Sequence, residues 1–281
     1  MRQFKDRVAV VTGGASGIGR AMALRFAREG MKVVLADIEG PALEATEREF
    51  RDLGLSATGV LCDVSKARDV EALAQAALRA HNGVHVVCNN AGVAPLGLVW
   101  EHSVKDWEWA LGVNVWGVIH GIRVFTPILL RQGDEGHIVN TASVAGLLSL
   151  PGMGMYCLTK HAVVALTETL YHDLTRRSDR VRCSVLCPAY VPTRISDSER
   201  NRPPDLRDGR TRSEEEQALE QQLRHAVQSG RISAEQVADM VLEAIRAERF
   251  YILPHQRIKG AIETRMQDIL MERAPTDTLK R

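Results

Sequence analysis

Short apolar runs alternate with amphipathic segments along most of the chain. Seven of the runs are rich in Val, Ile and Leu, and several lack polar alternation; they lie at residues 8–11, 32–36, 57–61, 84–88, 137–141, 182–186 and 250–253. Continuous apolar strands are typical of a parallel sheet that is buried on both faces. We therefore expect these seven runs to form the strands of one parallel sheet.

The segments between these runs have helical periodicity. Ile18, Met22 and Phe26 are spaced four residues apart and share one helical face, and Pro41 stands where a first helical turn accepts proline. Helices are expected at 18–28, 41–53, 67–80, 161–174 and 234–246. Strand–helix–strand alternation predicts a Rossmann-type, doubly wound α/β fold: a seven-stranded parallel sheet with helices on both faces, in a single domain over 1–281.

One stretch departs from this pattern. Residues 196–216 are crowded with Arg, Asp and Glu and include Pro203-Pro204. A solvated loop or disordered insertion has this composition, and so does a mobile lid, because long loops in compact domains are often lids. Both interpretations stay open, and we expect the wider segment 194–230 to be a charged insertion in the position of a substrate lid.

A glycine-rich turn connects the first expected strand to the first expected helix. Glycine permits a tight turn and close approach of a pyrophosphate, and a helix N-terminus offers free N–H groups and partial positive charge. The strand before it and the helix after it are the context that a dinucleotide-binding turn requires, although a plain tight turn is the alternative. The expected binding residues are Gly13, Ser16, Gly17, Ile18 and Gly19.

Asp37 ends the second expected strand, 18 residues after Gly19. A carboxylate at this place accepts hydrogen bonds from both ribose hydroxyls and repels a 2′-phosphate. Positions 16 and 38 hold Ser16 and Ile38, so neither supplies a cation for that phosphate. The sequence therefore favours NAD as cofactor, with Asp37 and Ile38 beside the ribose; a helix or turn cap is the other role open to Asp37.

Four polar residues stand out in the middle of the chain. Tyr156 and Lys160 are four residues apart, a spacing that puts both on one face of a helix. Ser143 lies just beyond an expected buried strand, and Asn114 interrupts an apolar segment. A surface pair, a cap and a buried amide explain each residue singly; their occurrence together with the glycine turn favours a catalytic set.

Together these motifs resemble the short-chain dehydrogenase/reductase family, in its compact single-domain, NAD-dependent branch. The resemblance runs from about Lys5 to Thr193 and, more weakly, through the last strand. The motifs that carry it are the turn 12–19, Asp63-Val64, Asn89-Asn90-Ala91-Gly92, Asn114, Ser143, Tyr156 to Lys160, and Pro188 to Thr193.

The resemblance implies a role for each catalytic position. Tyr156 is the general acid/base, and Lys160 binds the nicotinamide ribose and lowers the pKa of Tyr156. Ser143 orients the substrate oxygen, and Asn114 holds a water that links Lys160 to solvent. The chain is thus expected to be an enzyme that transfers a hydride to or from a CH–OH group.

The resemblance also implies the rest of the cofactor site. It predicts contacts to adenine, to the cofactor floor and to the carboxamide from Asp63, Val64, Asn90, Ala91, Gly92, Pro188, Val191 and Thr193. One departure is visible, because Ala189 follows Pro188 where the family usually has glycine. A methyl group is tolerable there if φ stays negative.

The energetics of the expected proton transfer are feasible. Free tyrosine titrates near pH ~10, so half-ionisation near neutrality needs roughly 4 kcal/mol. Two unit charges ~4 Å apart at an effective dielectric of ~20 interact by about 4 kcal/mol. We expect Lys160 and the cationic ring of oxidised NAD to supply most of this energy, so that Tyr156 takes the alcohol proton as hydride leaves the same carbon.

Two apolar segments, 93–98 and 144–155, are expected to wall the substrate pocket. Neither contains an arginine that clamps a carboxylate or phosphate; core packing is the alternative role. The expected substrate is therefore a hydrophobic secondary alcohol or its ketone, of aromatic, alicyclic or steroid-like type. Its expected contacts are Ser143, Ala145, Leu147, Met153, Tyr156 and Tyr190.

Two other functions stay open. An NADPH-dependent reductase of ketones or 3-oxoacyl thioesters has the same fold, and Asp37 argues against it. A non-catalytic NAD-binding regulator is more remote, because Asn114, Ser143, Tyr156 and Lys160 are all present.

Composition agrees with a soluble cytoplasmic protein. Hydrophobic residues make up 45% and charged residues 25% of the 281 residues, and the net charge is +1, so no basic excess predicts nucleic acid or membrane as partner. The first apolar run is too short for a signal sequence or a membrane span. The five cysteines are odd in number and lack zinc spacing, so we expect buried thiols and no metal site.

The segments 107–130 and 156–174 are too apolar to face solvent on every side. In the family that the chain resembles, such helices form contacts between subunits. We therefore expect a homo-tetramer or homo-dimer.

Overall fold

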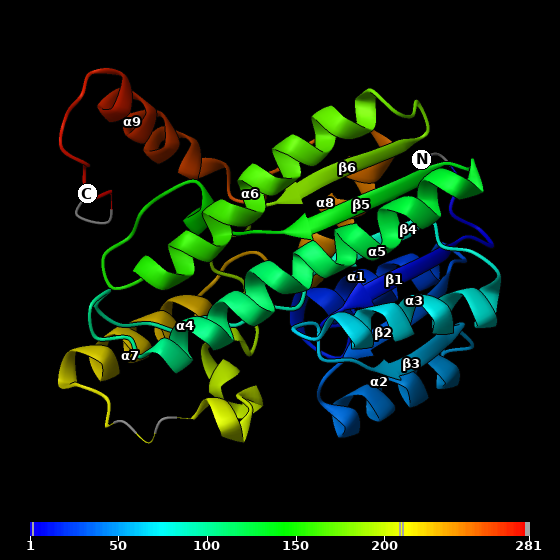
Figure 1. Cartoon of the computed structure of the whole chain (residues 1–281), viewed down its shortest axis with the longest axis horizontal. Coiled ribbons are helices and arrows are strands. Elements are labelled where there is room, and N and C mark those ends of the chain that lie inside the picture. The colour runs from blue at the N-terminus through cyan, green and yellow to red at the C-terminus, as the bar shows by residue number, and fades with distance from the viewer. Residues whose placement is uncertain (2, 208, 210, 279–281) are drawn as a thin grey trace.

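The architecture comes from a computed structural model that describes residues 1, 3–207, 209 and 211–278. Positions 208 and 210 of the expected insertion, and 279–281 at the end of the expected domain, lie outside the described residues. Figure 1 shows a central sheet with helices in front of it and behind it.

The sheet has seven parallel strands in the order β3-β2-β1-β4-β5-β6-β7. The expected doubly wound fold is therefore confirmed, and each expected run contains a strand. The strands are β1 (Val8–Thr12), β2 (Lys32–Asp37), β3 (Ala57–Leu61), β4 (Val86–Asn89), β5 (Gly136–Thr141), β6 (Val181–Leu186) and β7 (Tyr251–Ile252).

The expected start of β4 is wrong by two residues. The backbone N–H of Val84 donates to Gln132 Oε1 at 2.9 Å, and its carbonyl accepts from Gln132 Nε2 at 2.6 Å. A side chain of α5 (Gly117–Gln132) thus satisfies the backbone groups that a strand neighbour normally satisfies.

Two sets of helices cover the two faces of the sheet. The core on one face contains buried residues of α1 (Gly17–Arg28), α2 (Gly40–Asp52) and α8 (Ala234–Arg246). The core on the other contains those of α3 (Ala67–His81), α5 and α6 (Gly154–Thr175). α6 begins seven residues before its expected start, so Tyr156 and Lys160 both lie on it.

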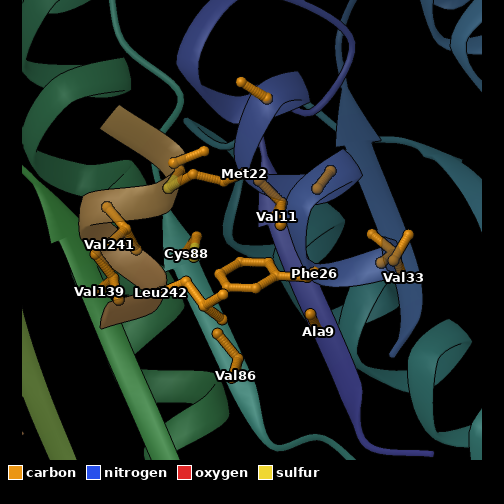
Figure 2. Packing of buried hydrophobic residues seen from close by; sticks show 14 of the residues in the cluster. Ala9, Val11, Met22, Phe26, Val33, Val86, Cys88, Val139, Val241 and Leu242 are labelled. Carbon is orange, nitrogen blue, oxygen red and sulfur yellow. The ribbon is translucent and has the colours of Figure 1, made fainter. Parts of the chain in front are cut away.

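Figure 2 shows the core on the α1 side of the sheet. The ring of Phe26 lies among Val11, Val86 and Leu242, and all four side chains are fully buried. Burial of one such side chain contributes about 2–3 kcal/mol. This packing fixes α1 against β1 and β4, and so fixes the glycine turn that precedes α1.

Much of the described insertion is helical rather than an irregular loop, while residues 202, 203, 207, 209 and 211–213 lie outside its helices. It contains η3 (Ile195–Asn201), η4 (Pro204–Leu206) and α7 (Glu214–Gln228). Ser213 and Glu216 form a capping box, and Glu214, Glu215 and Glu216 occupy the first turn of α7. Acidic residues there interact favourably with the helix dipole, so charge that suggested a loop in fact begins a helix.

The apolar segment around 107–130 is a composite helix. α4 (Val104–Leu111) continues through a π-helical turn, η1 (Gly112–Trp116), into α5. The run Val104–Gln132 is long and apolar enough to cross a membrane, with a mean hydropathy of 1.4. Phe125 and Leu129 of this run are buried in the core, and core helices pass the same test, so it is weak evidence for a membrane span.

One further helix, α9 (Lys259–Leu270), follows the last strand and has no counterpart in the expected elements. Figure 1 shows it projecting from the body beside the C-terminal end of the chain. Ala261 and Ile262 pack on a small core cluster with Ala145, Leu148 and Leu150. Short 3₁₀ turns complete the order, η2 (Val144–Gly146) after β5 and η5 (Gln256–Ile258) before α9.

Candidate active site

The main cavity lies at the carboxyl ends of the central strands. β1 is hydrogen-bonded to β2 on one side and to β4 on the other, so the chain direction across the sheet reverses there. In doubly wound sheets ligands bind at such a switch point. The expected site residues that line the cavity are Gly13, Ser16, Gly17, Ile18, Asp37, Ile38, Asp63, Val64, Asn90, Ala91, Gly92, Ser143, Tyr156, Lys160, Pro188, Val191 and Thr193.

The glycine turn leaves backbone open to the cavity. Gly13 and Gly17 have φ values of 63° and 52°, which disfavour other residues. Ser16, the N-cap of α1, makes no side-chain cap hydrogen bond, so the first N–H groups of the helix stay available. This arrangement fits a phosphate group at the N-terminus of α1.

Gly19 has a different function from the rest of the turn, because it does not line the cavity. A Cβ at Gly19 would lie 2.1 Å from the carbonyl oxygen of Gly13 and 2.5 Å from Asn90 Nδ2. Gly19 therefore allows α1 to approach the turn and the end of β4.

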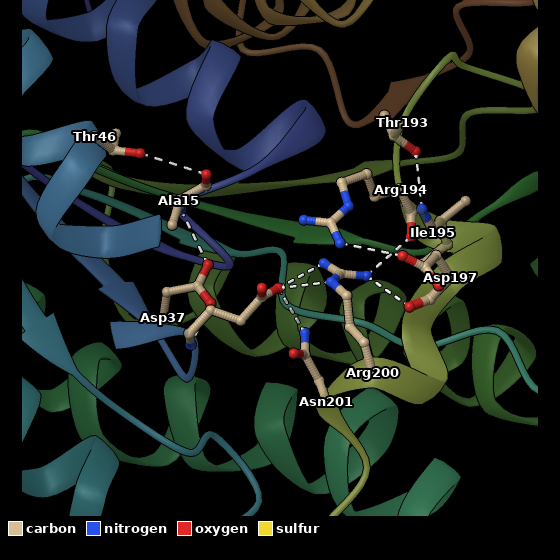
Figure 3. Close-up of polar contacts among 10 residues, drawn as sticks. Ala15, Asp37, Thr46, Thr193, Arg194, Ile195, Asp197, Arg200 and Asn201 are labelled. Atoms are coloured by element: carbon tan, nitrogen blue, oxygen red, sulfur yellow. Dashed lines mark hydrogen bonds and ion pairs between the residues drawn. The ribbon is translucent and has the colours of Figure 1, made fainter. Parts of the chain in front are cut away.

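Asp37 is buried and held by two backbone groups. Its Oδ2 accepts from the N–H of Ala15 and its Oδ1 from the N–H of Glu39, both at 3.0 Å. Asp37 therefore joins the end of β2 to the glycine turn, as Figure 3 shows for Ala15. Asp37 therefore caps the turn that follows β2 and also lines the cavity.

Tyr156 and Ser143 meet at the inner end of the cavity. Burial raises the pKa of Tyr156 to about 12, and a hydrogen bond with the Ser143 hydroxyl lowers it by a smaller amount. Ser143 Oγ also lies 3.3 Å from the carbonyl oxygen of Pro188 and 3.2 Å from the N–H of Ala145. The expected depression of the tyrosine pKa is therefore not a property of the protein without cofactor.

Lys160 is almost fully buried one helical turn from Tyr156. Its Nζ donates to the carbonyl of Thr141 at 3.0 Å and lies 5.6 Å from the centre of the Tyr156 ring. Burial lowers the pKa of Lys160 to about 8. A Cβ at Gly92 would lie 3.4 Å from Nζ, so that glycine leaves room for the amine.

Asn114 lies in the π-helical turn and is completely buried. Its Oδ1 accepts from the N–H of Val93 at 2.8 Å, and its Nδ2 donates to the carbonyl of Val93 at 2.9 Å and to Thr159 Oγ1 at 3.0 Å. The amide therefore fastens the segment after β4 to α6. The expected contact of Asn114 with a water is not needed to satisfy this side chain.

Asn90 connects the cavity floor to the first strand. Its N–H donates to Thr12 Oγ1 at 2.8 Å and its Nδ2 to the carbonyl of Thr12 at 3.0 Å. Asp63, on the opposite side, accepts from the N–H of Ser65 at 3.0 Å and from its hydroxyl at 2.7 Å. Both polar side chains are thus fixed before any ligand binds.

Four of the expected substrate contacts lie outside the lining of this cavity. Ala145 is buried in the cluster beneath α9, and Met153 packs against the same cluster. Leu147 packs on a separate core cluster, and Tyr190 is partly exposed. Most of the segment 144–155 therefore packs in the core, which is the alternative role considered for it, whereas Val93 of the segment 93–98 lines the cavity.

Several cavity residues were not expected from the sequence. Apolar contacts come from Trp109, Val113, Ala142, Ala189, Ile195 and Val227, and polar ones from Glu39, Arg194, Ser198, Arg200 and Asn201. Most of them belong to the insertion or to the segment around η1, so only tertiary structure brings them here. Among the described residues, no three His, Cys, Asp or Glu side chains come together in a metal-binding group.

The cavity fits a dinucleotide in three respects. The glycine turn and the uncapped α1 suit a pyrophosphate, Asp37 suits a ribose diol, and Lys160 with Tyr156 lies at the far end beside Gly92. Tyr156 thus lies in the same cavity as the glycine turn.

Comparison with known proteins agrees with this arrangement. Residues 7–204 match the model of the short chain dehydrogenase family. A solved structure of a short chain dehydrogenase/reductase from Burkholderia phymatum, in complex with NAD, is 52% identical with a TM-score of 0.97 and covers 99% of each chain.

Two curated relatives extend over nearly the whole chain. The CLA biosynthesis dehydrogenase/reductase of Lactiplantibacillus plantarum is 34% identical over 98% of this chain and 97% of its own. The 1-deoxy-11-beta-hydroxypentalenate dehydrogenase of Streptomyces exfoliatus is 36% identical over 95% of this chain and 89% of its own. With a family model over most of its length and relatives of this similarity, the chain belongs to the short-chain dehydrogenase/reductase family of oxidoreductases.

Proposed function

We propose that the protein is an NAD-dependent oxidoreductase that interconverts a hydrophobic secondary alcohol and its ketone. The observation that carries this proposal is the meeting of Tyr156, Ser143 and Lys160 in the same cavity as the glycine turn. The NAD complex of the Burkholderia phymatum relative supports the choice of cofactor, as does Asp37 at the end of β2.

The proposed oxidation divides the alcohol hydrogens between two acceptors. NAD⁺, held by the glycine turn and Asp37, would supply the hydride acceptor at its nicotinamide ring. Ionised Tyr156 takes the proton of the hydroxyl, which leaves a ketone and neutral Tyr156. Ser143 holds the substrate oxygen by a hydrogen bond, and Lys160 supplies positive charge beside the phenolate; reduction is the reverse.

The resting protein keeps this tyrosine neutral. Burial raises the pKa of Tyr156 to about 12, so positive charge has to be added before the phenolate forms near neutral pH. Oxidised NAD brings such a charge on its ring, and Lys160 adds to it while protonated. Activation of Tyr156 is thus tied to cofactor binding.

An apolar substrate suits the side chains that surround the inner cavity. Val93, Trp109, Val113, Ala189 and Val227 line it. The relative named as a hydroxypentalenate dehydrogenase supports a hydroxylated substrate, and we propose a bulky aromatic or alicyclic alcohol. We also propose that the 194–230 segment opens as a lid, and that Tyr190, which lies just before it, contacts substrate when the lid closes.

Replacement of Tyr156 tests the mechanism. Tyr156→Phe should reduce turnover by about a thousandfold or more, because loss of general acid/base catalysis removes about 10²–10⁴ in rate. NADH affinity, measured by nicotinamide fluorescence, should change less than about threefold. Tyr171→Phe, an exposed tyrosine of the same helix, is the matched control and should retain full turnover. Substantial residual turnover of purified Tyr156→Phe contradicts the assignment.

A substrate panel tests the rest of the proposal. The panel contains aromatic secondary alcohols, alicyclic secondary alcohols and small charged hydroxy acids. The kcat/KM of each substrate is measured with NAD⁺ and with NADP⁺. Preference for apolar secondary alcohols with NAD⁺ supports the proposal. Preference for charged hydroxy acids, or for NADP⁺, contradicts its substrate half or its cofactor half respectively.

Assembly and compartment complete the proposal. α6 has exposed positions at Leu158, Ala165 and Thr169, which fall on one side of the helix and carry no charge. We propose that this stripe lies in a contact between copies of the chain, as a homo-dimer or homo-tetramer. All five cysteines are buried and free, which suits the reducing cytoplasm that we propose as the compartment.

A further inference from the structure

Glu39 and Arg200 form an ion pair in the lining of the cavity, near Asp37. Glu39, two residues after Asp37, accepts from Arg200 Nε at 2.9 Å and Nη2 at 2.6 Å, and from Asn201 Nδ2 at 2.9 Å. Figure 3 shows the side chains of Arg200 and Asn201 close together, across from Asp37. All four side chains line the same cavity.

The guanidinium of Arg200 is held on its other side as well. Nη1 donates to the carbonyl oxygens of Asp197 at 2.8 Å and Arg194 at 3.1 Å. Arg200 thus connects η3 of the insertion to Glu39, two residues after the end of β2. Nε, Nη1 and Nη2 all have partners, so the guanidinium presents no pair of free nitrogens that could bind a phosphate bidentately.

The charges at this end of the cavity favour a ribose without phosphate. Hydrogen bonds from Arg200 and Asn201, with the charge of Arg200, hold the pKa of Glu39 below its usual value despite partial burial. Glu39 is therefore ionised at neutral pH, and Asp37 and Glu39 together outnumber Arg200. Arg194, the other cation here, is exposed and paired with Asp197 at 3.1 Å.

We propose that Glu39 is a second specificity-determining residue for the cofactor: by holding Arg200, it withholds the cation that a 2′-phosphate requires. This inference rests on the proposed NAD-dependent function. Asp37 repels the phosphate of NADP directly. Glu39 adds a second negative charge and keeps the partly buried guanidinium of Arg200 engaged.

The proposal predicts that removal of the Glu39 charge strengthens the binding of NADPH. Glu39→Gln keeps the shape of the side chain but weakens its hold on Arg200, and Glu39→Ala releases Arg200 completely. A charge-assisted hydrogen bond from the freed guanidinium to phosphate should strengthen NADPH binding by about tenfold or more. NADPH affinity should therefore rise in the order wild type, Glu39→Gln, Glu39→Ala, while NADH affinity changes less than about threefold.

A second substitution separates release of Arg200 from simple loss of repulsion. In Glu39→Gln/Arg200→Met and Glu39→Ala/Arg200→Met the cation is absent, so most of the gain for NADPH should disappear and only the smaller gain from lost repulsion should remain. Arg200→Met alone leaves both carboxylates and should bind NADPH no better than wild type. Glu29→Gln is the matched control, because Glu29 is likewise paired with arginine, in its case with Arg25 and Arg246 at 2.6 Å each, but lies away from the cavity.

The experiment measures binding without turnover. NADH and NADPH are titrated by nicotinamide fluorescence, and 5′-AMP and 2′,5′-ADP by calorimetry, with thermal unfolding as a check on folding. A gain for NADPH and 2′,5′-ADP in the Glu39 variants that Arg200→Met largely cancels supports the proposal. No gain, or a gain of the same size without Arg200, overturns it; wild type that binds neither NADH nor 5′-AMP overturns the proposed function itself. Either Glu39 variant suffices if the other does not fold.

Discussion

At the scale of single residues, burial disfavours the charged forms of two groups in the site. Burial raises the pKa of Tyr156 to about 12 and lowers that of Lys160 to about 8, so each group resists its charged form. A charged lysine in this position lowers the stability of the fold. The protein tolerates this because the same charge assists the phenolate during the proposed reaction.

Replacement of Lys160 should therefore stabilise the protein while it removes activity. At pH 7 the lysine is charged in both folded and unfolded states. Burial of this charge lowers the free energy of unfolding by about 3 kcal/mol, and the hydrogen bond to Thr141 offsets part of that loss. Lys160→Met should raise the free energy of unfolding by roughly 1–3 kcal/mol, as measured by urea denaturation, and reduce kcat at least a hundredfold.

The pH dependence gives this prediction a sign. Between pH 8 and the ordinary lysine value of 10.5, the unfolded chain holds the proton and the folded chain releases it. Wild-type stability therefore rises with pH relative to Lys160→Met, and the difference between the two proteins shrinks. A difference that is constant from pH 7 to pH 10 would show that burial of the charge is not its cause.

At the scale of elements, hydrophobic pattern and glycine spacing sufficed to predict the sheet and the turn. The apolar runs have a direct physical reason, since strands buried on both faces need continuous apolar side chains. No such local signal predicts the π-helical turn at Asn114, the position of η3 beside the cavity or the start of α6. They depend on contacts such as Asn114 with Val93 and Thr159, which join segments far apart in sequence.

The glycine turn yields a prediction at this scale. Gly19→Ala places a methyl group against the Gly13 carbonyl and Asn90, so α1 has to move away from the turn; we expect a loss of about 3 kcal/mol or more and weaker NADH binding. Gly40→Ala is the control, because Gly40 also lies in the first turn of a helix but a Cβ there meets only Leu61 Cδ1 at 3.8 Å. It should be neutral or slightly stabilising in thermal unfolding. Equal effects of the two substitutions would refute the close-packing argument.

At the scale of the whole molecule, ion pairs connect the insertion to two distant parts of the chain. Arg200 pairs with Glu39 after β2, and Arg202 pairs with Asp106 in α4 at 2.7 Å and stacks over Trp109. Composition alone showed a charged segment and left open a loop, a disordered insertion or a lid. The pairing partners lie up to 162 residues away, so no local pattern reveals them.

The uncharged stripe of α6 gives the prediction that concerns assembly. Ala165 is exposed at its middle, away from the cavity lining, and a contact between copies would bury it. Wild type should have the mass of a dimer or tetramer by light scattering, and Ala165→Arg should shift it toward the monomer, because a buried unpaired charge costs several kcal/mol. Leu53→Arg, an exposed apolar residue at the end of α2, is the control and should leave the mass unchanged. A monomeric wild type would contradict the proposed assembly, whereas an oligomer that Ala165→Arg leaves intact would place the contact on another face.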